Sequence, residues 1–452
     1  MKLILVPHTA DQQLVRLWAC ATDTNAPPTD FAVDVQGVGA VAVRRQDWLP
    51  VTAGGALSGA EIRTFVQVVT VAGLQPATRY VGTAGAARVR FSTLPAVLPR
   101  EGERPFTVLL SSCFAIGSDK GLAAGRLIAG LPEHLKPDLK FLVGDQVYLD
   151  FPAFIVGLPF TQAGLGRSLL SKYLRNWGDA AGYQALLEQG CTWFTADDHE
   201  FWNNYPNAAT IISNTWTAAG RAQLKSVTLP LFGDFQCEQA AQAGRSRQFQ
   251  AGSLSFFVAD TRVFRQPGDN EFMQPGDLAR LLDWVRTLSG PGVLVVGQPL
   301  FHEPANWFTK RVVDRHLANY EQYKELARAL TAARHSILML TGDVHFGRVA
   351  SAVLLGSPGQ PELIEVIGSP LALVRGSARF PPDAPDKFPP EAVAGAAQVP
   401  VRTNGELKKA GDNFAVLQFT EVPGRVKVRV RHWYIREPEG QQAGREATLS
   451  LF

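Results

Sequence analysis

Residues 141–150, FLVGDQVYLD, run from a short apolar stretch into Gly144, Asp145, Tyr148 and Asp150. The apolar start is typical of a strand that is buried on both faces, whereas the end carries two carboxyl groups and a phenol. A single acid in this place could cap a helix or close a turn. Polar residues at the ends of several strands would instead predict a binding crevice, because ligands bind at the carboxyl ends of strands in α/β sheets.

The same pattern recurs along the chain. Apolar runs that end in polar residues are FTVLLSSC (106–113), LKFLVGDQVYLD (139–150), CTWFTADDHE (191–200), SLSFFVADTR (253–262) and HSILMLTGDVHF (335–346). Helical periodicity lies between them, at 121–131, 180–189, 277–288 and 320–335. Buried strands that alternate with helices predict a layered α/β domain. The tail, 414–435, predicts a β-hairpin that turns at Pro423-Gly424.

Residues 1–95 differ from the rest of the chain. Short stretches of alternating apolar and polar residues, broken by Pro and Gly, predict a small all-β sandwich. Within it, LQPATRYVGTAG (74–85) resembles the tyrosine-containing corner of fibronectin type III-like and immunoglobulin-like domains. We expect a linker at 96–104 and one α/β domain at 105–452, in which 151–180, 205–245 and 375–412 are loops that shape the pocket.

The overall composition excludes several classes of protein. The 452 residues are 46% apolar and 19% charged, with a formal net charge of +3, which predicts a globular protein without a broad nucleic-acid-binding or membrane-binding surface. Four cysteines without CxxC spacing exclude a zinc ribbon. No apolar run is long enough to span a membrane. As numbered, the sequence predicts a cytoplasmic protein, or an exported one if a signal segment precedes it.

The residue types at the strand ends predict a metal site. Cys113, as a thiolate, and Tyr148, as a phenolate, suit a ferric ion, and Asp145 can bridge two cations. Asp343 and the pair Asn203 and Asn204 offer the hard oxygen atoms that calcium or magnesium prefers. Together they predict a trivalent iron beside a hard divalent ion, the kind of two-metal clamp that catalyses displacement at phosphorus.

These motifs resemble a known family. SSC, GDQVYLD, DDHEFWNN, DTRVFR and TGDVHFG, in this order, are similar to the PhoD-like alkaline phosphatases and phosphodiesterases of the metallophosphoesterase superfamily. The resemblance covers roughly residues 100–450, and it implies a layered α/β/β/α sandwich preceded by a β-sandwich domain. The purple acid phosphatases share the GDxxY motif but are more distant, because their paired-histidine ending is replaced by GDVH here.

The resemblance also implies a role for individual residues. It assigns Cys113, Asp145, Tyr148 and His345 to Fe³⁺, and it assigns Asp145, Asp343 and one of Asn203 and Asn204 to Ca²⁺, with Zn²⁺, Mn²⁺ or Mg²⁺ as alternatives. His199 would lie near the phosphate and its leaving group, with Asp198 beside it. We expect one of Asp197 and Asp198 to be structural, because only one of two adjacent acids should point inward. Arg262 would contact the phosphate or, with Asp260 and Arg265, form ion pairs beneath the site.

The sequence therefore predicts a hydrolase that cleaves a small phosphate ester by attack of metal-activated water. Two alternatives stay open at this point: a catalytically inactive binding or adhesion protein, and a Mg²⁺- or Mn²⁺-dependent nuclease-like phosphodiesterase. The near-neutral charge disfavours nucleic acid as a substrate or partner. Oligomeric state, the physiological substrate and the preference for monoesters or diesters do not follow from these residues.

Overall fold

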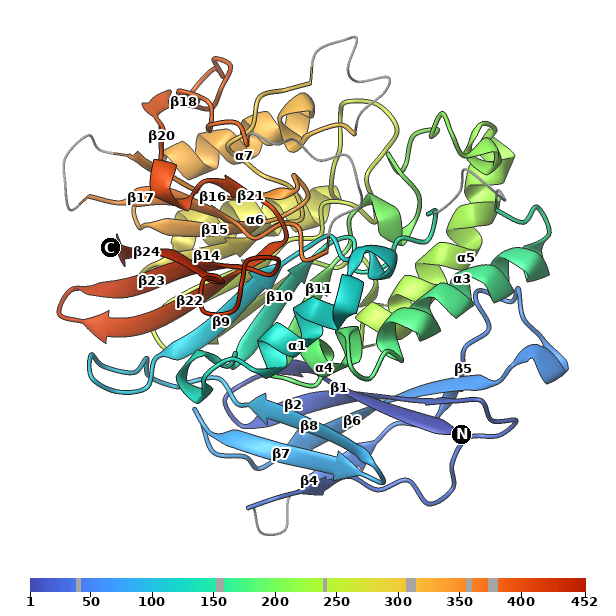
Figure 1. Ribbon diagram of the computed structural model, residues 1–452. Helices are drawn as coiled ribbons and strands as arrows, with labels where there is room; N and C mark the ends of the chain where they lie inside the picture. Colours follow the sequence, from blue (N-terminus) through green and yellow to red (C-terminus); the bar gives the residue numbers. More distant parts are fainter. Residues whose placement is uncertain (38–41, 152–157, 239–241, 306–313, 355–359, 373–380) are drawn as a thin grey trace.

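The computed structural model describes residues 1–37, 42–151, 158–238, 242–305, 314–354, 360–372 and 381–452. Its centre is formed by two packed β-sheets with helices outside both of them (Figure 1). The first sheet has the order β11 (Cys191–Thr195), β10 (Leu139–Val143), β9 (Phe106–Ser111), β22 (Asn413–Val422), β23 (Arg425–Tyr434) and β24 (Ala443–Leu451). In it, β9, β10 and β11 are parallel, and β22 and β23 form the predicted antiparallel hairpin.

The second central sheet carries the other parallel strands. Its order is β12 (Arg247–Ala251), β13 (Leu254–Val258), β14 (Gly292–Val295), β15 (Ile337–Thr341), β17 (Glu362–Ile367), β16 (Phe346–Val353) and β20 (Arg402–Thr403), and β21 (Lys409–Ala410) also pairs with β16. Strands β13, β14, β15 and β17 run parallel to one another. A separate two-stranded ladder joins β18 (Lys387–Phe388) to β19 (Val399–Pro400).

The alternation of side chains along each strand produces the layers. In β10, Phe141 joins the apolar cluster between the two sheets, whereas its neighbour Leu142 joins the cluster under the outer helices. In β14, Val295 faces the same inner cluster, and Leu294 packs with the helices on the other side. Since successive side chains of a strand point to opposite faces, strands that are covered on both sides read as continuous apolar runs.

Two groups of helices cover the outer faces. On the first sheet lie α1 (Ala123–Ala129), α3 (Gln162–Trp177), α4 (Tyr183–Leu187) and α5 (Ala218–Gln236), and on the second lie α6 (Pro275–Thr287) and α7 (Glu321–Thr331). The four helical periods that we predicted correspond to α1, α4, α6 and α7. The expectation of loops at 151–180 and 205–245 is wrong, because these stretches contain α3 and α5. Part of 375–412, up to residue 380, lies outside the described residues.

The first 92 residues form two antiparallel sheets. One contains β1 (Lys2–Ala10), β2 (Leu14–Thr22), β6 (Thr64–Ala72), β4 (Ala42–Arg45) and β5 (Leu49–Pro50), and the other contains β3 (Asp34–Val35), β7 (Arg79–Ala84) and β8 (Ala87–Ser92). The backbone N–H of Gln75 donates to the Tyr80 hydroxyl at 2.8 Å, as in the corner that the sequence resembles. The fibronectin type III-like identity and the proposed boundaries stay predictions.

Contacts tie these N-terminal sheets to the rest of the chain. Trp18 of β2 donates from Nε1 to the Asp234 carbonyl of α5 at 2.7 Å, and its ring lies in the apolar cluster under α3 and α5.

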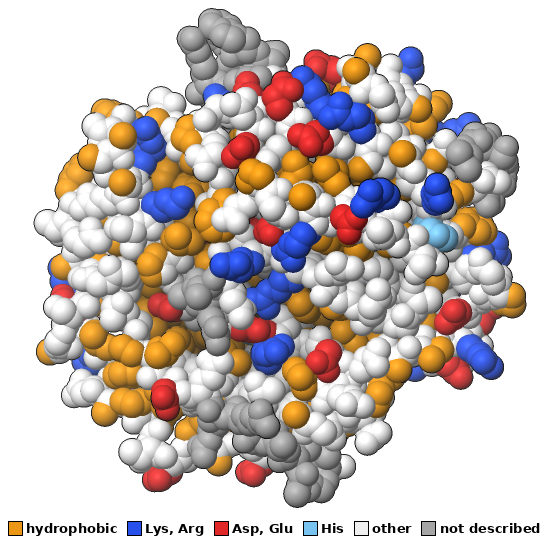
Figure 2. All heavy atoms as spheres, turned by 180° about the vertical axis from the view of Figure 1, so that it is seen from behind, with side chains coloured by type: hydrophobic (Ala, Val, Ile, Leu, Met, Phe, Trp, Pro, Cys, Tyr) orange, Lys and Arg blue, Asp and Glu red, His pale blue; other side chains and the backbone are white. Residues whose placement is uncertain are grey.

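On the opposite side of the molecule from Figure 1, basic and acidic side chains lie interspersed over the surface (Figure 2). No helix in the described ranges is both long and apolar enough to cross a bilayer.

A buried ion pair fixes the loop that follows β14. The Glu365 carboxylate accepts the backbone N–H groups of Leu300 and Phe301, at 2.6 and 3.0 Å, and pairs with Arg348 at 2.8 Å. Arg348 also donates to the Phe301 carbonyl at 2.6 Å, and both charged side chains are almost completely buried.

Replacing Glu365 by Ala should lower the free energy of unfolding by about 3–5 kcal/mol, because the Arg348 guanidinium would stay buried without its counter-charge. Glu365→Gln should cost less, since the amide oxygen still accepts one backbone N–H. Denaturant unfolding measures both, with the exposed Glu391→Ala as the control. Equal stability of Glu365→Ala and the parent would contradict this role.

Candidate metal centre

The predicted site residues follow the carboxyl ends of parallel strands in both central sheets. Cys113 follows β9, Asp145 follows β10, and His199 follows β11, while Asp343 and His345 follow β15. The predicted site residues therefore lie at the edge at which the two sheets present their strand ends.

An unusual backbone conformation marks this edge. Within the described chain, nine residues other than glycine have a positive φ, and five of them are predicted ligands. These five are Cys113 (58°), Asp145 (57°), Asn204 (66°), Asp343 (69°) and His345 (59°). Left-handed backbone is costly for residues with a Cβ and tends to persist where function requires it. Here it turns the chain sharply at each strand end, next to the site.

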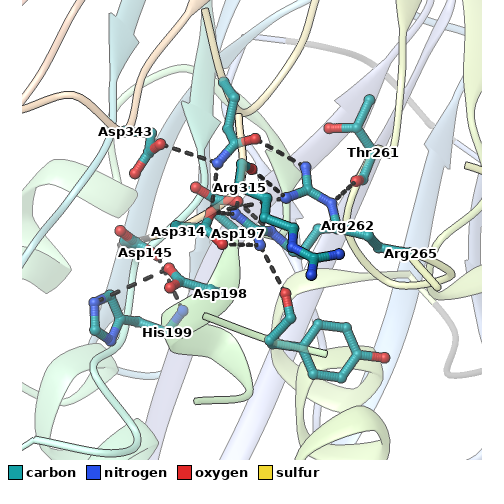
Figure 3. Close-up of polar contacts among 12 residues, drawn as sticks. Asp145, Asp197, Asp198, His199, Thr261, Arg262, Arg265, Asp314, Arg315 and Asp343 are labelled. Atoms are coloured by element: carbon teal, nitrogen blue, oxygen red, sulfur yellow. Dashed lines mark hydrogen bonds and ion pairs between the residues drawn. The ribbon is translucent and has the colours of Figure 1, made fainter. Parts of the chain in front are cut away.

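Two clusters of carboxylate and imidazole groups share one member. Asp145 lies with Asp198 and His199 in one cluster and with Asp197 and Asp343 in the other, and within each cluster the candidate ligand atoms lie within 4.8 Å of one another. Asp145 is 1% exposed. The residue that was predicted to bridge two cations is therefore the one that both clusters have in common (Figure 3).

The Cys113 thiol lies at the edge of these clusters. Its Sγ is 3.5 Å from Asp145 Oδ2, and the hydroxyl groups of Ser112 and Ser369 lie 3.3 and 3.4 Å from it. Burial and the neighbouring charges of Asp145 and Asp343 raise the pKa of Cys113 well above its usual value. Without a cation nearby, this thiol is protonated and unreactive.

The Tyr148 phenol is buried, and among the described residues its hydroxyl has no hydrogen-bond partner. Its ring packs on the His199 imidazole, with the ring centroids 4.1 Å apart. Burial, followed by the charges of Cys113 and Asp145, raises the pKa of Tyr148 well above 10. A buried polar atom without a partner is rare in folded proteins, and a bound ion is one of the few explanations for it.

His199 is held in place by a second carboxylate. Asp150 Oδ1 lies 2.7 Å from His199 Nδ1, and Asp198 Oδ1 lies 4.0 Å from Nε2. Burial lowers the pKa of His199, but the charges of Asp150, Asp198 and Asp145 outweigh it and raise this pKa well above 6.5. The imidazole is half-buried.

Glu200 organises the loops beneath the site. Its carboxylate accepts the backbone N–H groups of Asp145, Gln146 and Asp197, at 2.9, 2.6 and 2.8 Å, and it is completely buried. One side chain thus fixes the loops after β10 and β11 relative to each other. Gly144 allows the close approach of these loops, because a Cβ there would collide with Asp197.

An arginine cluster lies behind the carboxylates (Figure 3). The Arg262 guanidinium pairs with Asp197 and Asp314 and donates to the Tyr205 carbonyl at 2.8 Å. Gln298 donates to Asp314 at 2.6 Å and to Asp343 at 3.1 Å, which links the cluster to the site. The pKa of Asp314 stays low, at about 2, because the Arg262 charge outweighs burial.

The expectations for the acidic pair and for Arg262 have different outcomes. The expectation that only one of Asp197 and Asp198 points inward is wrong, because each lies in a cluster with Asp145. A 3₁₀ turn at Asp198–Glu200 interrupts the alternation of a strand, so that both side chains reach the site. The ion pairs of Arg262 are present, but its partners are Asp197 and Asp314. Asp260 instead accepts the backbone N–H of Arg262 at 3.1 Å.

For the remaining predicted ligands the structure gives positions and leaves their roles as predictions. The backbone N–H groups of Asn203 and Asn204 donate to Asp150 and Asp198, at 2.7 and 2.6 Å. His345 is half-buried beside the site, and burial and the His199 charge lower its pKa to about 4. A neutral imidazole is the form that binds a metal.

Several residues of the site were not predicted. Glu200 could have been found from the spacing Asp-x-x-Glu at 197–200, which is typical of a capping box at a helix start. Asp314 and Gln298 have no motif around them, and only the folded chain brings them to Asp343. The hydroxyl groups of Ser112 and Ser369 contact the Cys113 thiol only because the folded sheets bring them together, and no local sequence pattern reveals this.

Metal-free protein should lose stability as the pH rises through about 6. Burial, followed by the charges of Asp314 and Asp198, raises the pKa of Asp343 from 3.8 to about 6, so the folded state binds a proton that the unfolded chain has released. This stabilisation is complete below the unfolded pKa and is lost above the folded one. Thermal melting of chelated protein at about pH 5 and about pH 8 measures it.

A divalent cation should reverse this trend, raising the melting temperature more at the higher pH, because protons compete with it for the carboxylates. Asp343→Asn should weaken both effects, whereas Asp283→Asn, on the exposed side of α6, should change neither. A pH-independent response to the cation would contradict the site.

Glu200→Ala should weaken cation binding by roughly 10–100-fold, because the ligand-bearing loops lose the carboxylate that holds them. Titration calorimetry below the melting temperature measures the affinity for the cation. The affinity of Glu200→Gln should fall between those of the parent and Glu200→Ala. The exposed Glu133→Gln serves as the control. If Glu200→Ala bound the cation as tightly as the parent, the carboxylate would have no role in shaping the site.

Comparisons with known proteins support the fold. No protein-family model and no curated protein matches the sequence. Among solved structures, the chain is similar to the purple acid phosphatase PPD1 isolated from yellow lupin (Lupinus luteus) seeds, with a TM-score of 0.57 and 10% identity. The similarity covers 99% of this chain and 74% of that one. At this identity the comparison shows the fold alone: a layered α/β architecture similar to that of the lupin protein.

Proposed function

We propose that this chain is a metal-dependent phosphoesterase that hydrolyses phosphomonoesters, phosphodiesters or both, in the manner of the PhoD-like enzymes. The observation that carries the proposal is the position of Asp145 in both carboxylate clusters. A shared carboxylate between two clusters is the arrangement that a two-metal phosphoesterase needs. The similarity in fold to a purple acid phosphatase supports the same class of reaction.

The donor atoms of this chain fit two different cations. Cys113, Asp145, Tyr148 and His345 would hold a ferric ion, for which a thiolate and a phenolate are suitable ligands. The unpartnered Tyr148 hydroxyl and the protonated Cys113 thiol fit such an ion, since binding would deprotonate and satisfy both groups.

Asp145, Asp343 and one of Asn203 and Asn204 would hold calcium, which prefers oxygen ligands. When bound, the two cations would balance the charge of a phosphate ester and lower the pKa of the attacking water. Cys113, Asp145, Tyr148 and Asp343, all ionised, carry less negative charge than Fe³⁺ and Ca²⁺ carry positive charge. Because Asp198 also lies in a cluster with Asp145, the loaded site would be close to neutral, and the cations themselves would attract the phosphate oxygens.

The side chains of the chain supply proton transfer and positioning. Water that has released a proton to solvent would bond to phosphorus as the bond to the leaving oxygen breaks, and His199, held by Asp150, would donate its proton to that leaving oxygen. Asp150 holds the ring through Nδ1, which leaves Nε2 for the substrate. Arg262 acts from behind by orienting Asp197, because its own donors are occupied by protein groups. Cys113 would act as a metal ligand and not as a nucleophile.

Hydrolysis of a chromogenic phosphomonoester and of a chromogenic phosphodiester tests the proposal, with and without added calcium. The parent should turn over at least one of them, and Asp145→Asn should lose at least about a hundredfold in kcat/KM, because both cations lose a ligand. His199→Ala should lose roughly 10²–10⁴-fold, and most strongly for esters with poor leaving groups.

Asp283→Asn should match the parent, since this carboxylate lies exposed on α6. Absence of turnover after reconstitution with iron and calcium, and with zinc, manganese or magnesium, would contradict the proposal and favour a binding protein. Hydrolysis confined to nucleic acid would favour the nuclease-like alternative.

A further inference from the structure

Large apolar side chains are exposed together at the N-terminal ends of α3 and α5. Phe160 is 68% exposed, Ile211 47% and Trp216 62%. We call these three residues the apolar tip. Figure 1 shows α3 and α5 running side by side from the interior to the edge of the molecule. Exposed apolar residues that stand alone are ordinary, whereas a group of them marks an interaction surface.

Hydrogen bonds hold the segments of the tip together. Asn214 donates from its side-chain amide to the Pro159 carbonyl at 3.1 Å, and Gln223 donates to the Phe160 carbonyl at 2.9 Å. Trp216 donates from Nε1 to the Ala209 carbonyl at 3.2 Å, so its polar atom is satisfied while its ring stays exposed. The apolar surface is therefore built into the fold.

Basic side chains outnumber acidic ones in the helices that carry the tip. Residues 158–178 and 205–233 contain five basic side chains and no acidic one, and Asp179 and Asp234 follow these ranges directly. The five are Arg167, Lys172, Arg175, Arg221 and Lys225. Arg221 donates to the Thr215 carbonyl at 2.7 Å, which places it beside Trp216. Arg167 is paired with Glu61 of the N-terminal region.

The tip lies far from the metal centre. Gln236, the last residue of α5, donates to Glu200 at 3.3 Å, whereas the tip lies at the first turn of the same helix. A helix of 19 residues is about 28 Å long. The tip and the candidate metal centre therefore lie at opposite ends of α5.

We propose that the apolar tip docks onto an anionic lipid bilayer. Tryptophan, phenylalanine and isoleucine side chains insert at the interface of a membrane, and neighbouring arginine and lysine side chains are attracted to anionic headgroups. A second copy of the chain fits less well, because a symmetric contact would bring the same basic segments together. The docking surface is local and is compatible with the near-neutral charge of the whole chain.

Co-sedimentation of the full chain with vesicles tests the proposal. The parent should bind vesicles of phosphatidylcholine with phosphatidylglycerol about tenfold more tightly than vesicles of phosphatidylcholine alone, and added salt should weaken this binding. The double variant Phe160→Ser and Trp216→Ser should lose about tenfold or more, because it removes the inserted surface. Val97→Ser, in the linker and 70% exposed in the parent, is the matched control and should bind as the parent does.

The substituted side chains are exposed, so the double variant should melt at the parent's temperature. Trp216→Phe should keep vesicle binding while reducing quenching of tryptophan fluorescence by brominated lipid. Lack of binding to either vesicle, or equal binding of the parent and the double variant, would overturn the proposal. A dimer in sedimentation velocity that the double variant abolishes would overturn it in favour of a second copy. None of these readouts requires turnover, so the outcome is independent of the proposed phosphoesterase activity.

Discussion

Four carboxylates, those of Asp145, Asp197, Asp198 and Asp343, are held close together in a buried site, and the surrounding structure serves to keep them there. Like charges at such distances repel, and in the absence of a cation this repulsion and burial raise the pKa values of Asp145 and Asp343. Glu200 binds the loops from below, Arg262 pairs with Asp197, and Gln298 links Asp343 to Asp314. A fold that gathers these four carboxylates favours the binding of cations between them.

The layered fold explains how residues far apart in the sequence meet at this point. Parallel strands of two packed sheets end at a common edge, and left-handed turns at Cys113, Asp145 and Asp343 follow these ends. The rigid sheets fix the spacing of the candidate ligands. His199 and His345 are half-buried, whereas Asp145 is buried. The candidate metal centre and the apolar tip thus lie at opposite ends of α5.

Much of this arrangement could be predicted from local patterns. Apolar runs that end in polar residues identified the strands of the parallel part, and the residue types at their ends identified Cys113, Asp145, Tyr148 and Asp343 as candidates. The layered α/β architecture followed from runs that are apolar on both faces, and the α/β/β/α order of the layers was implied by the resemblance. Buried strands are well marked in a sequence because the apolar run ends where the strand ends.

Other features depend on contacts that no local pattern contains. Gly164 and Gly166 obscure the start of α3, and Pro230 lies within α5, although the packing of their apolar faces stabilises both helices. Asp314 reaches Arg262 across 52 residues, and the inward direction of both Asp197 and Asp198 depends on a 3₁₀ turn that the sequence pattern leaves open.

The most direct test of the central claim is the metal content of the purified protein, measured together with its visible absorption. The account predicts about two cations per chain, one of them iron, and an absorption band of iron bound to a phenolate that disappears in Tyr148→Phe. Zinc, manganese or magnesium alone would contradict the assignment of Cys113 and Tyr148. A chain that binds no cation, even after reconstitution, would contradict the metal centre itself.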